Sequence, residues 1–304
     1  MKSIRLPIIV LGLFHALWPV IAQSAQPAIR PQIAEEVSKQ ESIYHSQGQE
    51  VPEGYTIDRA LEAYAAMLPP VFADNLAGLG PKDRWLDIGA GKGHAILGYY
   101  AQSYDLAHAA GRERRGKKAQ AVAMSIEDRR TPLWQQTAAI LEPNQIQYLT
   151  NKRLREYSLE ELDRFKLITD VIGGFSYSVD LSLFMEKVLS FLEMNGSFHT
   201  VLQDVHSEAG SNVPFYANAP YLTEITNADG SKDKVCSWLK SISCVEVTCE
   251  LKTGWRPPIE SFHVKKVCDV VTVPALVPVH YQAGTPPERR YRKKAEVTVS
   301  PRKP

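Results

Sequence analysis

The sequence predicts an α/β fold in which helices cover both faces of a mostly parallel sheet. Short apolar segments alternate with segments of helical periodicity from residue 56 onward. The connections between the apolar segments are long enough for crossover helices, which parallel strands require. The alternation ends in two strand-like segments joined only by a short Gly-Trp-Arg-Pro-Pro loop, and this predicts an antiparallel pair.

Each element follows from a local pattern. Apolar residues at helical spacing from Thr56 predict a first helix, which ends at Pro69-Pro70. Strands are expected at residues 84–88, 118–126, 146–149, 165–172 and 197–203, and helices at residues 95–104, 131–141, 159–163 and 181–193. A helix at 234–242 and strands at 244–252 and 262–271 complete the domain.

Composition divides the 304 residues into four parts. The α/β domain covers residues 56–273, and residues 26–55 form a loose polar lead-in without a clean period. Residues 274–304 are rich in proline and then basic, which predicts a disordered tail. The formal net charge of +1 gives no specific signal for nucleic acid or for an acidic partner.

Residues 1–25 have the layout of a signal peptide. Lys2 and Arg5 precede a mostly apolar run over residues 6–22, and small residues follow it. This layout predicts a chain exported to the periplasm or secreted, with no membrane span after cleavage. An uncleaved anchor is the alternative, because the apolar run lies just below the length that spans a bilayer.

A glycine-rich loop follows the first strand. The sequence from Trp85 to Gly93 is WLDIGAGKG. A dinucleotide fingerprint needs a third glycine where His94 stands, and a phosphate-binding P-loop needs a glycine where Leu86 stands. The remaining pattern, Asp-x-Gly-x-Gly-x-Gly after a strand, resembles that of the class I S-adenosylmethionine-dependent methyltransferases, and the order of elements extends this resemblance over residues 56–271.

This resemblance implies a Rossmann-like sheet of seven strands, with an antiparallel last strand, and S-adenosylmethionine as the cofactor. Asp87, Gly89, Gly91 and Gly93 would form the cofactor loop, because glycines let a backbone turn sharply and approach a ligand closely. Asp87 would orient the loop and attract the ammonium group of the ligand.

The ends of the next two strands supply further candidate contacts to the cofactor. Glu127 would bind the ribose hydroxyls, because a carboxylate accepts two hydrogen bonds from a diol, and Asp128 is the alternative. A structural role as a charge at a helix N-terminus is the competing interpretation of Glu127. Asn151 stands where the family often has an acid that faces the adenine amino group, and its side-chain oxygen can accept the same hydrogen bond.

The end of the fourth strand supplies candidates for the catalytic face. The resemblance puts Asp170, Gly173, Phe175 and Tyr177 beside the sulfonium and the acceptor. An apolar strand followed by ordinary turn residues is the competing interpretation. The candidate catalytic residues are Asp170, Tyr177 and His206; Asp170 is also a candidate cofactor contact, and His199 is a further candidate base. Substrate contacts are expected in the turn-rich segment 204–222.

The four cysteines lie in the last third of the chain. In an exported protein they permit up to two disulfides, with three possible pairings. Cys244 and Cys249 point to opposite faces of a regular strand and cannot bond each other, whereas either of them can pair with Cys268 on the neighbouring strand. Buried free thiols are the alternative, and neither the cysteines nor the histidines have the spacing of a metal site.

The sequence therefore predicts an S-adenosylmethionine-dependent methyltransferase and leaves its acceptor open, as either a small molecule or a protein. An exported binding module that keeps the fold without the catalysis is the alternative. That alternative arises because the cofactor is made inside cells, whereas the N-terminal segment predicts export.

Overall fold

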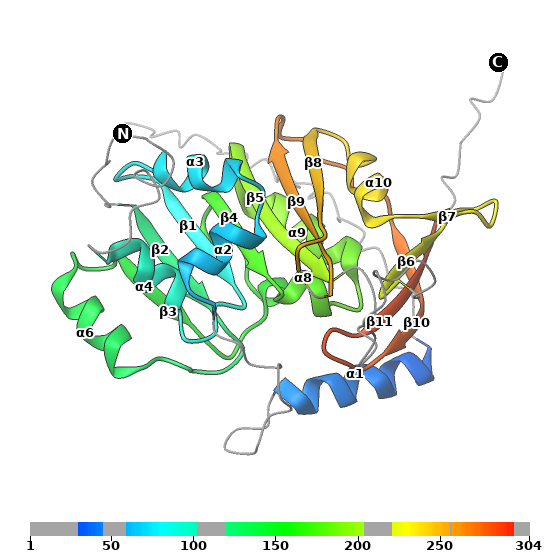
Figure 1. Ribbon diagram of the computed structural model, residues 1–304, viewed down its shortest axis with the longest axis horizontal. Coiled ribbons are helices and arrows are strands. Elements are labelled where there is room, and N and C mark those ends of the chain that lie inside the picture. Colours follow the sequence, from blue (N-terminus) through cyan, green and yellow to red (C-terminus); the bar gives the residue numbers. More distant parts are fainter. Residues whose placement is uncertain (1–29, 45–58, 102–118, 204–220, 256, 295–304) are drawn as a thin grey trace, which may run out of the picture.

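The structure, a computed structural model, describes residues 30–44, 59–101, 119–203, 221–255 and 257–294. A seven-stranded sheet of order β3-β2-β1-β4-β5-β9-β8 forms its centre (Figure 1). Its strands are β1 Arg84–Ile88, β2 Gln120–Met124, β3 Ile146–Leu149, β4 Phe165–Val171, β5 Leu192–Gln203, β8 Val245–Lys252 and β9 Ile259–Lys266. The first five are parallel, whereas β9 is antiparallel to both β5 and β8. The predicted Rossmann-like sheet with an antiparallel last strand is confirmed.

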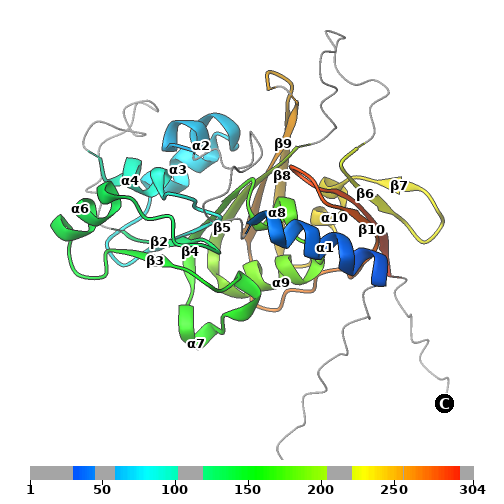
Figure 2. The same cartoon turned by 90° about the horizontal axis from the view of Figure 1, so that it is seen from below.

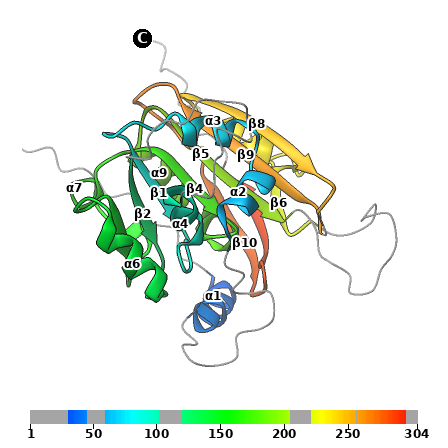
Figure 3. The ribbon, with the colours of Figure 1, turned by 60° about the vertical axis from the view of Figure 1, so that its left-hand side comes forward.

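Helices cover both faces of this sheet, as predicted (Figure 3). One face carries α2 Leu61–Met67, α3 Val71–Ala77, α4 His94–Tyr100 and α6 Pro132–Ile140. The other carries η1 Leu154–Glu156, α7 Leu159–Leu162, α8 Gly174–Tyr177, α9 Leu181–Phe191 and α10 Val235–Lys240. Because side chains alternate along a strand, Trp85 of β1 is buried under the first group and its neighbour Leu86 under the second.

A second sheet of order β10-β11-β6-β7 lies beside α8 and α10 (Figures 1 and 2). It consists of β6 Thr223–Thr226, β7 Lys232–Asp233, β10 Leu276–Gln282 and β11 Glu288–Lys293. The prediction of a disordered tail over residues 274–304 is therefore wrong for β10 and β11. In β11 the side chains of Arg289 and Tyr291 are buried and that of Arg290 between them is only half-buried, so a strand of period two lies within the basic run. Residues 295–304 lie outside the described part of the chain.

Helix α1 Pro31–Tyr44 also corrects a prediction, because it lies within the segment expected to be a loose lead-in. Ile33 is buried and Val37 packs beside it, but the next inward position is Gln40, a buried polar residue. The apolar positions are too few to mark a helix by periodicity alone. The predicted signal peptide lies outside the described residues, among which no helix is long and apolar enough to cross a membrane.

Two disulfides tie together the end of the sheet around β8 and β9. Cys236 of α10 bonds Cys249 of β8, and Cys244 bonds Cys268, with Cα–Cα distances of 6.1 and 5.1 Å. The second pairing is one of the two that the sequence analysis allowed with Cys268. The first joins a helix to a strand, and the spacing of cysteines along the chain gives no indication of such a contact.

Reduction of the two disulfides is expected to lower the free energy of unfolding by about 3 kcal/mol for each bond, because each bond restricts the unfolded chain. The bonded residues are 13 and 24 positions apart, so the longer loop gives the slightly larger effect. Urea denaturation with and without a reducing agent measures the change. A stability that does not respond to reduction would contradict it, and peptide mapping under non-reducing conditions tests the pairing separately.

Candidate functional site

The glycine loop connects β1 to α4 and is shaped by backbone conformations that favour glycine. Gly89, Gly91 and Gly93 have φ values of 70°, 55° and 74°. A Cβ atom on Gly89 would lie 2.9 Å from the Cα atom of Gly173, and one on Gly93 would overlap the ring of Trp134. Two segments therefore press against this loop, and only glycine fits at both points.

A cavity of about 260 Å³ opens beside this loop at the carboxyl ends of β1, β2 and β4. In an open parallel sheet, ligands bind at such an edge where the strand order reverses, and here the order reverses between β1 and β4. Gly89 and Gly91 line the cavity, whereas Gly93 is not among the lining residues and supports the loop through its contact with Trp134. Residues 124–127 and 172–174 form two of its other sides.

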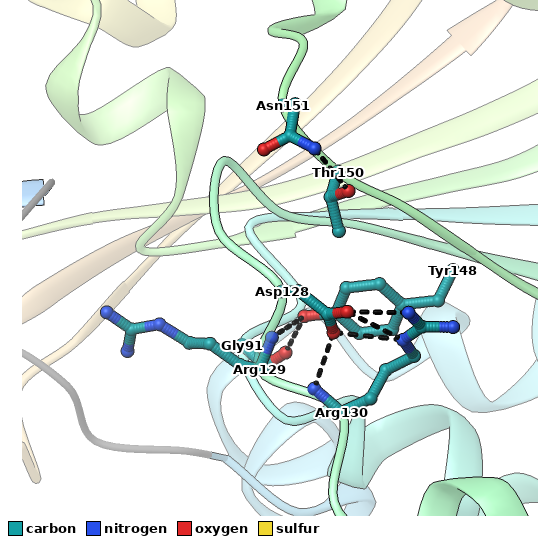
Figure 4. Close-up of polar contacts among 7 residues, drawn as sticks. All are labelled: Gly91, Asp128, Arg129, Arg130, Tyr148, Thr150 and Asn151. Atoms are coloured by element: carbon teal, nitrogen blue, oxygen red, sulfur yellow. Dashed lines mark hydrogen bonds and ion pairs between the residues drawn. The ribbon is translucent and has the colours of Figure 1, made fainter. Parts of the chain in front are cut away.

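Glu127 lies at the cavity and Asp128 does not. Glu127 is 8% exposed, and its carboxylate ion-pairs with Arg129 at 3.4 Å. Asp128 is turned outward, where its carboxylate binds the guanidinium of Arg130 at 2.5 Å (Figure 4). Of the two acids that the sequence offers at the end of β2, only Glu127 can therefore meet a ligand in this cavity.

The carboxylate of Asp87 faces away from the cavity. It is fully buried under α2 and accepts hydrogen bonds from the hydroxyls of Tyr64 at 3.0 Å and Thr169 at 2.7 Å. Burial raises its pKa to about 7, against the lowering effect of these two hydrogen bonds. Asp87 anchors the strand from which the loop begins. It is not among the cavity residues, so the expected direct contact with an ammonium group has no support in this geometry.

Asp170 holds the turn after β4 and does not face the cavity. Its two oxygens accept hydrogen bonds from the backbone N–H groups of Gly173 at 2.9 Å and Phe175 at 3.0 Å. Burial raises the pKa of Asp170 to about 7, and the nearby charge of Asp87 acts in the same direction. Its position therefore corresponds to a positioning residue, and the expected catalytic and cofactor-binding contacts have no support here.

The end of β3 differs from the expectation as well. Asn151 is exposed, and its side-chain amide donates to the hydroxyl of Thr150 at 3.0 Å, away from Asp128 and Arg130 (Figure 4). It is absent from the cavity lining, which is instead formed there by residues 152–155. A left-handed φ of 66° at Asn151 turns the chain so that these next residues face the cavity.

Of the candidate bases that the structure describes, Tyr177 lies at the cavity and His199 lies in the core. Tyr177 lines the cavity, and Phe175 is buried in the core beside it. His199 lies under α3, fully buried and stacked on His263 with ring centroids 4.6 Å apart, and burial holds its pKa well below the usual value. It is therefore a core histidine. His206 and most of the segment expected to contact substrate, residues 204–220, lie outside the described residues.

Two elements line the cavity that sequence reasoning did not assign to a site, namely α1 and β10. Val37, Gln40 and Glu41 of α1 reach it, together with Tyr281 of β10. Glu41 ion-pairs with Arg153 at 2.7 Å, which joins α1 to the segment after β3. Both elements lie in segments predicted to be irregular, so the sequence carried no signal that they contribute to a site.

Basic side chains are more frequent than acidic ones around the cavity. Glu41, Glu127 and Asp180 face a larger group made up of Arg129, Lys152, Arg153, Arg155 and Lys187. Such a surplus favours a ligand that carries a carboxylate or another anionic group. Among the described residues, no cluster of three or more histidine, cysteine, aspartate or glutamate side chains could hold a metal ion.

The raised pKa values of Asp87 and Asp170 predict that stability falls as pH rises. Both carboxyls bind a proton up to about pH 7 in the folded chain but only to about pH 4 when unfolded, so the folded state holds more protons between these values. The stabilisation is complete below pH 4 and is lost as pH rises through 7, with a slope of about 1 kcal/mol per pH unit for each group. Asp87→Asn should flatten this slope in urea denaturation at pH 5 to 8. An equal slope in wild type and variant would contradict the assignment.

No protein-family model matches this chain, and no curated protein matches it. Solved structures with a similar arrangement include a putative S-adenosylmethionine-dependent methyltransferase from Listeria monocytogenes, 14% identical, with a TM-score of 0.40, over 65% of this chain and 99% of the other. An rRNA methylase from Streptococcus thermophilus is 13% identical, with a TM-score of 0.38, over 65% and 95%. Phosphoethanolamine N-methyltransferase 2 from Haemonchus contortus, solved with S-adenosyl-L-methionine, is 10% identical, with a TM-score of 0.41, over 71% and 59%.

Proposed function

We propose that this protein is an S-adenosylmethionine-dependent methyltransferase whose cofactor lies across the loop from Gly89 to Gly91. One observation carries the proposal: a left-handed glycine loop and a mostly buried carboxylate, Glu127, line one cavity at the reversal point of the sheet. The loop leaves room for close approach of a ligand, and Glu127 supplies an acceptor for two ribose hydroxyls. The loop and this acceptor together suit a ligand in which a nucleoside carries a charged chain.

When bound, S-adenosylmethionine supplies an electrophilic methyl group on a sulfonium. The residues of this chain then have to hold an acceptor in line with that methyl and keep water away, and positioning of this kind can contribute roughly 7–11 kcal/mol to a reaction. Tyr177 at the end of α8 and residues 178–180, which connect α8 to α9, line one side of the cavity. A general base is optional where the acceptor is already nucleophilic.

The experiment that tests the proposal is calorimetric titration of the chain without residues 1–25 with S-adenosylmethionine and S-adenosylhomocysteine. Residues 1–25 lie outside the described fold, so none of its contacts is removed. We expect micromolar binding, with Glu127→Ala as the variant that removes a cavity contact and Asp87→Ala as the one that removes an anchor of the loop. A folded wild-type chain that binds neither compound would refute the enzyme and leave the exported binding module.

We further infer that the acceptor is a small molecule. Helix α1 lines the same cavity as the glycine loop and Tyr177, and a wall of this kind favours an acceptor small enough to enter the cavity. To test this, methyl-labelled S-adenosylmethionine is incubated with the protein and a cell extract. The mixture is then separated by ultrafiltration into a small-molecule and a macromolecular fraction. We expect label in the small-molecule fraction, and label confined to macromolecules would contradict the inference.

Export remains part of the proposal. Two disulfides support it, because such bonds persist in oxidising compartments. Expression of the full chain followed by cell fractionation and N-terminal mass analysis tests it. A mature chain that begins after about residue 22 is expected; an intact N-terminus in the membrane fraction would favour the anchor, and a soluble chain inside the cell would argue against export.

A further inference from the structure

The cavity wall formed by residues 173–180 is held from two sides. Asp170 binds its first backbone N–H groups, as described above. Its later carbonyl groups accept hydrogen bonds from the second sheet: Arg289 donates to the carbonyls of Phe175 and Ser178, both at 2.9 Å. The wall thus lies between a carboxylate at its start and a guanidinium at its end.

Two tyrosines of the second sheet bind the same wall. The hydroxyl of Tyr281 donates to the carbonyl of Tyr177 at 3.0 Å, and the hydroxyl of Tyr291 donates to the carbonyl of Ser178 at 3.0 Å. Three side chains from β10 and β11 therefore bind three carbonyls, those of Phe175, Tyr177 and Ser178, and Tyr177 is the aromatic residue of the wall that lines the cavity. This fixes the backbone on both sides of Tyr177.

Burial of an arginine at this position costs free energy, because its charge is removed from water. Its side chain is fully buried, and in the described part of the chain no carboxylate pairs with it. Its remaining donors reach the hydroxyl of Thr223, at 2.9 and 3.2 Å. Burial of a charge costs free energy unless hydrogen bonds compensate, and an apolar side chain would join the two sheets at lower cost. What an apolar side chain cannot do is bind two carbonyls of the wall at once.

We propose that Arg289 is a positioning residue for the cavity: it fixes the wall at residues 173–180, and Tyr177 in particular, in the conformation that binds ligand. The proposal rests on the proposed function for the identity of that ligand. It also gives the second sheet a role, because this sheet supplies Arg289, Tyr281 and Tyr291 to the wall.

The test compares three variants of the full chain. Arg289→Met keeps length and removes all donors; Arg289→Lys keeps the charge but loses the planar group that binds the wall through Nη1 and Thr223 through Nε and Nη2. Lys293→Met is the matched control, because it lies in the same strand and pairs with Asp233 at 2.6 Å, away from the wall. Calorimetry with S-adenosylhomocysteine, well below each melting temperature, measures affinity. Hydrogen–deuterium exchange without ligand measures the opening of residues 173–180 against that of β5.

We expect Arg289→Met to weaken binding about tenfold, as lost hydrogen bonds to a charged group would, and to speed exchange at 173–180 while leaving β5 unchanged. Arg289→Lys should fall between wild type and Arg289→Met, and Lys293→Met should match wild type in both measurements. Wild-type exchange at the wall in Arg289→Met overturns the proposal, and so does faster exchange with unchanged affinity, which would indicate a purely structural residue.

Two further outcomes are separable. If Arg289→Met does not fold, Arg289→Lys retains the charge and is compared with Lys293→Met, and wild-type exchange at residues 173–180 in Arg289→Lys overturns the proposal. If wild type does not bind S-adenosylhomocysteine, the proposed function fails; the exchange measurement needs no ligand and still decides whether Arg289 fixes the wall.

Discussion

Replacement of Glu127 by alanine is expected to weaken the binding of S-adenosylhomocysteine about 100-fold while the fold is retained. Hydrogen bonds to a charged group contribute roughly 1.5–3 kcal/mol each, and the ribose offers two hydroxyls, so a loss near 3 kcal/mol is a conservative expectation. The side chain lies at the cavity at the end of β2, where it ion-pairs with Arg129. Calorimetric titration measures the change.

Asp128→Ala is the matched control for this prediction. It removes a carboxylate from the next position in the chain, but one that binds Arg130 at the surface and does not line the cavity. Its affinity for S-adenosylhomocysteine should equal that of wild type. Equal losses in the two variants would mean that the charge near the end of β2 matters and its position does not, and wild-type affinity in Glu127→Ala would remove Glu127 from the site.

The central sheet could be predicted from the sequence because its information is local. Strand β1, RWLDI, is a short apolar run before glycines, and parallel strands buried on both faces have this character. The loop from β8 to β9 is too short for a crossover, so their antiparallel pairing follows from chain length alone. Neither inference requires knowledge of distant contacts.

The second sheet could not be predicted in this way. In β11 an arginine occupies a buried position, where the carbonyls of Phe175 and Ser178 accept hydrogen bonds from it. These partners are adjacent in space but more than 100 residues away in the sequence. A local pattern assigns such a residue to solvent. Helix α1 is similar: Gln40 is buried because its side-chain oxygen accepts a hydrogen bond from the backbone of Gly284 at 2.9 Å.

For the site, the sequence indicated which strand ends meet but not where their side chains point. Asp87 lies one residue before the end of β1, on the face that α2 covers, so the alternation of the strand directs it to Tyr64. Asp170 is turned from the cavity for a different reason: the chain after β4 folds back, and its backbone N–H groups donate to the Asp170 carboxylate. Most of the cavity residues that the central sheet contributes lie just beyond its strands, where loop conformation decides direction.

Gly89→Ala is expected to abolish measurable binding of S-adenosylhomocysteine and to lower the free energy of unfolding by about 2–3 kcal/mol. The left-handed φ of 70° strains any residue with a Cβ atom. The new atom would also lie 2.9 Å from the Cα atom of Gly173, which is backbone and cannot rotate aside. Movement of Gly173 would in turn disturb the turn after β4, because its backbone N–H donates to the carboxylate of Asp170 at 2.9 Å.

The strain therefore has to appear as a shift of the loop or of the wall, and both line the cavity. Gly254→Ala is the matched control: it adds the same methyl group in the turn between β8 and β9, where no described atom outside the adjacent chain lies within 4 Å and φ is not left-handed. It should change stability by less than about 0.5 kcal/mol and leave affinity intact. If Gly89→Ala behaves like Gly254→Ala in urea denaturation and calorimetry, the close approach of β1 and β4 is not what shapes the site, and binding would have to depend on Glu127 and the residues after β3 instead.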